Sequence, residues 1–347
     1  MLPNELKPDC LYVFLFGPGF GECCAIRIPP NHWVIIDSCR IAERSAAEHL
    51  LDKYSGECSC LILTHRHRDH YRGFADLLDW SEWSHVGCSD QNLTKIEATT
   101  TDPVERLSND LEDVFSKIKN HWQCFPESKW WTWRNSRQTK GTSELVVLHP
   151  DEDPPTDPLK DDVDANERST AILVTWEKSK LLFSADILGS NWQSIFEHFG
   201  EQEDHCFLKI PHHGSRDSLH DCFMTGARDR LWAGTPFNKS TKLPDFADGG
   251  PVHQMQAYVE SIYFTGLPIR KGLQARSPQS ATRQEVIEAT ITDNQFLLPG
   301  GRTGVDLPIS DGLNNFIVFR FEPTGDKHVE MMGPGSISLV TNREGIS

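Results

Sequence analysis

Four side chains of the kinds that bind metals lie together in one short segment. Cys60–Thr64 is predicted to form a short apolar strand, and it leads directly into His65-Arg66-His67-Arg68-Asp69-His70. Imidazole and carboxylate ligands at this density favour zinc, manganese or iron. A lone histidine at a strand end is usually structural. Four ligand-type residues in six positions instead predict a metal site.

The elements that must position this segment alternate between strands and helices. Further strands are predicted at Leu11–Phe16, Cys24–Ile28, His32–Asp37, Leu145–Leu148, Ala171–Trp176, Lys180–Ser184, Cys206–Ile210, Arg230–Ala233, Ile262–Thr265 and Phe316–Glu322. Helices are predicted at Ile41–Tyr54, Phe74–Leu78, Pro103–Trp122 and Val252–Ser261. This order is typical of a layered α/β fold rather than a helix bundle.

Length and composition predict one large domain. The chain has 347 residues, 38% of them hydrophobic, which is enough to bury a sizeable core. No linker divides it, so we expect a single domain over residues 1–347. A Trp-rich helical insertion at about 80–140 and a C-terminal extension from about 270 would decorate that domain. The tryptophans pack the insertion onto the body or, alternatively, stack on bases or sugars.

The charge balance limits the partners. A formal net charge of −16 argues against broad adhesion to nucleic acid or anionic lipid, but it permits a nucleic-acid enzyme with a confined positive cleft. No apolar stretch is long enough to span a bilayer, and no secretory signal is visible. Ten cysteines without zinc-type spacing are expected to be reduced and mostly buried. We therefore expect a cytoplasmic protein without a membrane association.

The segment at 65–70 has the His-x-His-x-Asp-His pattern of the metallo-β-lactamase superfamily, which this sequence resembles. Asp37, Asp186 and Pro211-His212-His213-Gly214-Ser215 follow in the order of that superfamily's other motifs. The resemblance covers most of residues 10 to 270. It implies a four-layer αβ/βα sandwich with two mixed β-sheets and helices outside.

The finer similarity is to the lactamase-like hydrolase domain of ComEC-type competence proteins. It rests on Asn166-Glu-Arg-Ser169, Ala185-Asp186 and Leu208-Lys209-Ile210-Pro211-His212-His213-Gly214-Ser215, with Ala185 in place of the usual glycine. Most such domains are appended to membrane channels. This sequence shows no membrane part, so the resemblance does not imply DNA uptake. Stand-alone domains of this type often occur beside ATPases or proteases in bacterial defence systems, which suggests a protein partner of that class.

The resemblance implies two divalent metal ions, zinc or manganese. His65, His67 and Asp186 would hold one ion, and Asp69, His70, Asp186 and one of His212 or His213 the other. The third motif of the superfamily usually supplies a histidine. Asn166 stands at the matching place, and His149 is the competing candidate. Loss of an imidazole makes the site richer in oxygen and shifts its preference toward manganese.

The chemistry implied by such a site is hydrolysis by a hydroxide that bridges the two metals. Asp69 would orient this hydroxide. The other member of the pair His212 and His213, or Lys209, would stabilise charge or protonate the leaving group.

The arginines near the ligands suggest the substrate. Arg66 and Arg68 alternate with the ligands, and Ser215 follows the last histidine, so all three suit phosphate oxygens. The alternative is that the arginines point into solvent. We expect a phosphodiesterase, most plausibly a nuclease. The alternatives are a hydrolase of a small ester, lactone or cyclic nucleotide, and a catalytically inactive metal-binding partner protein.

Overall fold

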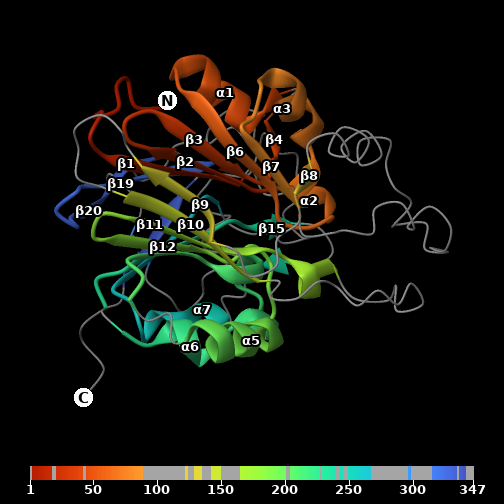
Figure 1. Ribbon diagram of the computed structural model, residues 1–347. Coiled ribbons are helices and arrows are strands. Elements are labelled where there is room, and N and C mark those ends of the chain that lie inside the picture. The colour runs from red at the N-terminus through yellow and green to blue at the C-terminus, as the bar shows by residue number, and fades with distance from the viewer. Residues whose placement is uncertain are drawn as a thin grey trace, which may run out of the picture.

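Two β-sheets face each other, and helices cover their outer faces (Figure 1). The computed structural model describes residues 2–17, 21–41, 44–88, 122–123, 129–134, 142–149, 165–200, 204–226, 228–238, 242–244, 249–266, 296–297, 315–333 and 336–340. Helices α1 (Ala46–Lys53) and α3 (Phe74–Trp80) lie on one side. Helices α5 (Gly189–Phe199), α6 (Asp221–Met224) and α7 (Pro251–Gln256) lie on the other. The predicted four-layer αβ/βα sandwich is confirmed.

The first sheet carries the predicted metal segment. Its strands, in spatial order, are β20 (Lys327–Met332), β19 (Phe316–Phe321), β1 (Leu11–Phe16), β2 (Cys23–Ile28), β3 (His32–Ile36), β6 (Glu57–Leu63), β7 (His85–Cys88) and β8 (Trp122–Gln123). Strands β1, β2 and β3 are antiparallel neighbours, whereas β3, β6 and β7 run parallel. The sheet is therefore mixed, and β3 and β6 end at the same edge.

The second sheet is also mixed. Its order is β18 (Phe296–Leu297), β21 (Ile337–Val340), β17 (Ser261–Phe264), β14 (Leu231–Gly234), β13 (Phe207–Lys209), β12 (Ser179–Phe183), β11 (Ala171–Trp176), β10 (Thr142–His149) and β9 (Lys129–Arg134). Strands β12, β13, β14 and β17 are parallel to one another. Their carboxyl ends therefore meet at one edge, where a site can be assembled.

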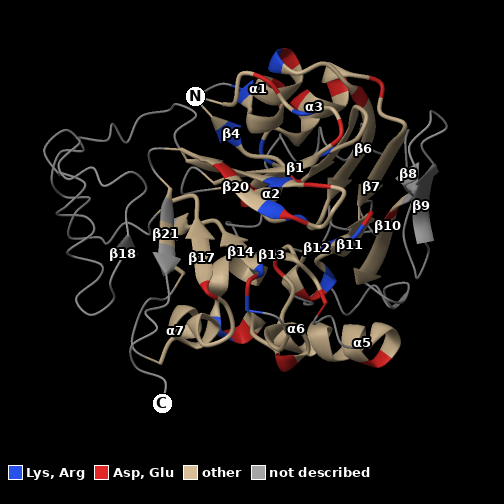
Figure 2. Cartoon of the chain, turned by 90° about the vertical axis from the view of Figure 1, so that its left-hand side faces the viewer, with Lys and Arg blue, Asp and Glu red and all other residues tan. Residues whose placement is uncertain are grey.

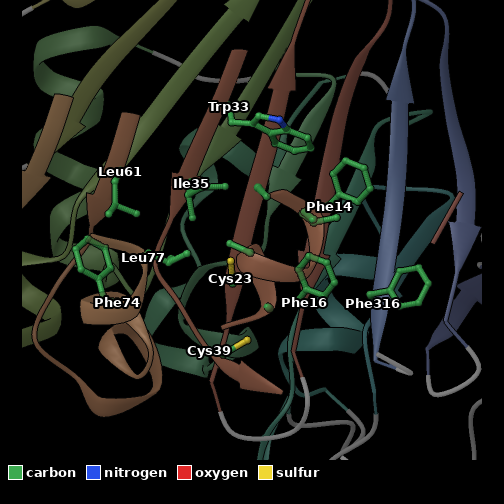
Figure 3. Packing of buried hydrophobic residues seen from close by; sticks show 14 of the residues in the cluster. Phe14, Phe16, Cys23, Trp33, Ile35, Cys39, Leu61, Phe74, Leu77 and Phe316 are labelled. Carbon is green, nitrogen blue, oxygen red and sulfur yellow. The ribbon is translucent and has the colours of Figure 1, made fainter. Parts of the chain in front are cut away.

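Alternation along the strands separates the core into layers. On β1, Leu11, Val13 and Leu15 face the second sheet, and the residues between them face the helices α1 and α3. Figure 3 shows the helix-facing cluster, which includes Phe14 and Trp33. Charged residues lie mainly on helices and loops, while the strands are largely uncharged (Figure 2). The strands are therefore buried on both faces, as a four-layer sandwich requires.

Several predicted elements differ in extent. The helix predicted from Ile41 begins only at Ala46, because Ser45 and Glu48 form a capping box that starts α1 there. The helix predicted to end at Ser261 ends at Gln256, and Ser261 begins β17. Helix α5 was not predicted. The helix predicted over 103–122 lies outside the described residues, except that Trp122 belongs to β8. No helix in the described ranges is long and apolar enough to cross a membrane.

The layer between the sheets gives a direct test of this packing. Phe207 on β13 is fully buried and its ring lies against Phe183, Phe319 and Phe321. We predict that Phe207→Ala lowers the free energy of unfolding by about 3–5 kcal/mol, because it leaves a cavity in the core. Phe196 on α5 is 39% exposed, so Phe196→Ala should cost only a few tenths of a kcal/mol. Urea denaturation measures both. Equal losses would contradict the packing.

Candidate metal centre

The ends of strands from both sheets bring the predicted ligands together. From the first sheet, Asp37 follows β3 and the segment from His65 to His70 follows β6. From the second sheet, Asp186 lies after β12 and His213 lies after β13. All of these side chains are buried except Arg66, His67 and Arg68. Residues more than 100 positions apart in sequence thus converge at one point.

His70 and His213 each turn Nε2 toward the same two carboxylates. His70 Nδ1 lies 2.8 Å from Asp37 Oδ2, and His213 Nδ1 lies 2.9 Å from Thr235 Oγ1. These partners leave the Nε2 atoms to face Asp69 Oδ2, at 3.7 and 3.2 Å, and Asp186 Oδ2, at 3.3 and 3.5 Å. An Nε2 atom that faces two carboxylates either carries a proton or faces a cation between them.

A second group adjoins the first. His65 Nε2 lies 3.0 Å from His67 Nδ1 and 4.0 Å from Asp186 Oδ2. His65 Nδ1 lies 3.0 Å from Thr64 Oγ1, whose own proton is donated to Asp37. The Nδ1 atom of His65 is therefore the donor, and its Nε2 carries the lone pair. Two groups of side chains could each hold a cation, Glu22, His70, Asp186 and His213 in one and His65, His67 and Asp186 in the other. Asp186 belongs to both, which is the arrangement expected of a centre for two cations.

The charge balance of the site also requires cations. Four carboxylates are buried around it, those of Glu22, Asp37, Asp69 and Asp186, and Lys209 is the buried ammonium among them. Buried charges are costly unless they are compensated, so this excess of negative charge fits divalent cations. His70 Nε2 also has no hydrogen-bond partner within the described structure, as expected of a buried ligand atom.

The pKa shifts have the same origin. Burial alone would raise the pKa of Asp186, but His213 and His70 outweigh it and hold this pKa well below the ordinary value. Burial would lower the pKa of His70, but Asp186, Asp37 and Asp69 raise it well above the ordinary value. Both pKa shifts arise because the buried carboxylates and the imidazoles beside them stabilise each other's charged forms.

Glu22 was not predicted from the sequence. It holds Lys209 in a buried ion pair, away from the role on the leaving group that was predicted for Lys209. Glu22 precedes β2, and its Oε1 accepts a 2.7 Å hydrogen bond from Lys209 Nζ, which also donates to Ala185 O at 3.0 Å. Lys209 was predicted to act on the leaving group, but only 1% of it is exposed. The one available signal was a carboxylate directly before an apolar run, Gly21-Glu22-Cys23-Cys24.

The sequence left two choices open, His212 or His213 and Asn166 or His149. His213 lies against Asp69 and Asp186, whereas His212 is half-buried and its Nε2 lies 3.4 Å from Asn166 Nδ2. His149 Nδ1 donates to Ser169 O at 2.9 Å, and its Nε2 accepts from Asn191 at 3.1 Å. Both nitrogens of His149 are thus engaged outside the two ligand groups. Asn166 instead contacts His212 of the last motif.

The backbone around the centre is strained. Asp37, Ala185, His212 and His213 have φ values of 60°, 43°, 44° and 53°, in the left-handed region that favours glycine. Ala185 occupies the place where the sequence pattern usually has glycine. Its carbonyl accepts hydrogen bonds from Lys209 Nζ and from the His212 amide. Strain of this kind is concentrated at functional sites, where it fixes the direction of side chains.

The residues predicted to bind phosphate are less buried than His65, Asp69 and His70. Arg66 is half-buried, and Arg68 is exposed at the start of α2 (Arg68–Tyr71). In Figure 1, α2 lies beyond the strand ends of the upper sheet, near the lower sheet. Ser215 is half-buried, and its amide donates to His212 O at 2.9 Å.

Comparison with known proteins gives weak structural likenesses. No protein-family model and no curated protein sequence matches this chain. The metallo-β-lactamase fold protein YhfI from Bacillus subtilis is 12% identical, with a TM-score of 0.38 over 73% of this chain and 95% of its own. Igni18, a metallo hydrolase from Ignicoccus hospitalis, is 11% identical, with a TM-score of 0.34 over 64% and 82%.

A third likeness is to CmlA, a diiron β-hydroxylase from Streptomyces venezuelae. It is 15% identical to this chain, with a TM-score of 0.32 over 59% of this chain. This chain spans only 35% of the CmlA chain.

The shared position of Asp186 yields a prediction about metal content. After chelation and reloading with zinc, the wild-type chain should retain two ions by elemental analysis. Asp186→Asn should lose at least one of them, because it removes a charge common to both ligand groups. His149→Ala should keep two, since both of its ring nitrogens are engaged elsewhere. Two ions in Asp186→Asn, or a loss in His149→Ala, would contradict the ligand groups.

Proposed function

We propose that this chain is a metal-dependent hydrolase that cleaves phosphodiesters, with nucleic acid as the preferred substrate class. The observation that carries the metal-dependent part is the convergence of imidazole Nε2 atoms and carboxylate oxygens at a buried point with excess negative charge. The basic residues Arg66 and Arg68, on the segment that also supplies ligands, support the choice of an anionic substrate.

The proposed ligands divide into two sets. His65, His67 and Asp186 would hold one ion. Asp69, His70, Asp186 and His213 would hold the other. Zinc and manganese both suit these nitrogen and oxygen donors. When bound, such ions activate water and stabilise the negative charge that develops on a phosphoryl oxygen.

The chain's own groups then have distinct tasks. Asp69 orients the attacking water and accepts its proton on a carboxylate oxygen. His212 is half-buried, and its Nδ1 lacks a hydrogen-bond partner in the described structure, so its Nδ1–H would stabilise the leaving oxygen through a hydrogen bond. Arg66 and Arg68 position the phosphate through paired N–H donors, and Ser215 adds a hydroxyl. Lys209 stays buried beside Glu22 and compensates charge rather than touching the substrate.

The role of Asp69 gives a kinetic prediction. Asp69→Ala should lower kcat about 10²–10⁴-fold, because both a proton acceptor and a ligand charge are lost. Asp221→Ala, at an exposed carboxylate on α6, should keep wild-type kcat. Hydrolysis of a chromogenic phosphodiester measures both. An Asp69→Ala chain with full activity would remove Asp69 from the reaction.

The substrate class is tested with metal-reloaded protein. We expect cleavage of single-stranded or duplex DNA, RNA, or a generic phosphodiester in the presence of zinc or manganese. Hydrolysis of carboxylic esters or lactones alone would refute the phosphodiester assignment and leave the metal centre intact. Binding of two metals without any hydrolysis would favour a catalytically inactive partner protein.

The arginines provide a separate prediction about substrate binding. Arg66→Ala combined with Arg68→Ala should raise KM for an oligonucleotide about tenfold, with a smaller change in kcat, because phosphate contacts are lost. Arg44 forms ion pairs with Asp52 and Glu48. Arg44→Ala removes a positive charge that belongs to neither ligand group, so it should leave KM unchanged. Equal effects in the two variants would indicate only a change in overall charge.

A further inference from the structure

Glu22 is joined to His213 through the hydroxyl of Thr235. Thr235 Oγ1 donates to Glu22 Oε2 at 2.7 Å, so it has no proton left for His213. The 2.9 Å contact from His213 Nδ1 to Thr235 Oγ1 must therefore use the Nδ1 proton, and Thr235 O lies 3.3 Å from the same nitrogen. This chain of hydrogen bonds fixes the tautomer whose Nε2 lone pair faces Asp69 and Asp186.

Glu22 is joined to Asp186 through Lys209. Lys209 Nζ lies 2.7 Å from Glu22 Oε1 and 3.6 Å from Asp186 Oδ1. Asp186 Oδ2, the other oxygen, is the one nearest His70, His213 and His65. The ammonium thus occupies one side of the Asp186 carboxylate and leaves the other side for cations.

Both oxygens of Glu22 are therefore hydrogen-bonded to Lys209 or Thr235, although Glu22 lies within the group of side chains around His70, Asp186 and His213 that could hold a cation. Glu22 also faces the Nδ1 side of His70 and His213, at 3.7 and 3.6 Å, rather than the Nε2 side. Gly21 has φ = 105°, and a Cβ there would lie 2.7 Å from the Cys39 Cβ, so only glycine lets the chain enter at this point. The Glu22 amide donates to Asp69 O at 2.9 Å, which ties this turn to the ligand segment.

The geometry points to Glu22 as a positioning residue of the metal centre, which orients His213 through Thr235 and sets the charge on Asp186 through Lys209. This inference rests on the metal centre of the proposed function. It adds that the centre depends on a buried acid–ammonium pair that touches neither the ions nor the substrate. Loss of such supporting partners typically weakens metal affinity about 10–100-fold.

The test is a zinc titration of the metal-free full-length chain against a chromogenic chelator, without substrate. Thr235→Val should lower the affinity for one of the two zinc ions about 10–100-fold and leave the affinity for the other unchanged. Thr265→Val is the matched control. Thr265 is also fully buried, follows the neighbouring parallel strand β17 and donates its hydroxyl to Gly17 O at 3.0 Å. It should bind both ions as the wild type does. Equal affinities in the two valine variants would overturn the relay.

The charge link is tested in the same assay by rescue. Glu22→Gln should weaken zinc binding, because Lys209 is left to neutralise Asp186. Adding Lys209→Met to that variant restores the charge balance, and the affinity should recover. No recovery in the double variant would overturn the charge link. Complete loss of one ion in Glu22→Gln with wild-type binding in Thr235→Val would make Glu22 a ligand and overturn the inference.

The zinc assay separates this inference from the proposed function. A chain that shows the expected affinities but cleaves no phosphodiester refutes the proposed function and leaves the positioning role of Glu22 in place. A wild-type chain that takes up no zinc overturns both. The visible absorption spectrum of the cobalt-loaded chain gives a second readout, since a reoriented His213 should change it in Thr235→Val but not in Thr265→Val.

Discussion

The structure depends on one electrostatic constraint, the burial of several carboxylates around a cluster of imidazoles. Asp69 and Asp186 face the Nε2 atoms of His70 and His213. Among the described residues, Lys209 is the only buried lysine. In a medium from which water is excluded, such a cluster is unstable without further positive charge. Divalent cations would provide that charge. The same requirement accounts for the direction of three imidazoles, because the Nδ1 atoms of His65, His70 and His213 each have an acceptor behind them.

The fold satisfies this constraint through the ends of its strands. Parallel strands β12, β13 and β14 deliver Asp186, His213 and Thr235 to one edge of the second sheet. Strands β3 and β6 deliver Asp37 and the ligand segment to the facing edge of the first. The apolar layer between the sheets holds the two edges in register. Local backbone strain at Ala185 and His213 is accepted because it aims these groups into the centre.

Much of this arrangement could be predicted from the sequence, because the signals are local. The ligand segment after an apolar strand, Asp186 at the end of a hairpin and the paired histidines each stand out within a few residues. Glu22 and Thr235 could not be found in this way. Each is a single polar residue beside an apolar strand, and they become neighbours only when β2 and β14, in different sheets, are brought together. The choice between His212 and His213 was likewise left open, because it depends on left-handed backbone angles that residue types do not reveal.

The most direct test of the metal centre is an anomalous X-ray diffraction experiment on crystals soaked in zinc or manganese. We expect one anomalous peak within bonding distance of His70 Nε2, His213 Nε2 and Asp186, and a second beside His65 Nε2 and His67 Nδ1. A peak on the Nδ1 side of His70, or the absence of any peak after a soak at saturating metal concentration, would contradict a two-cation centre built on Asp186.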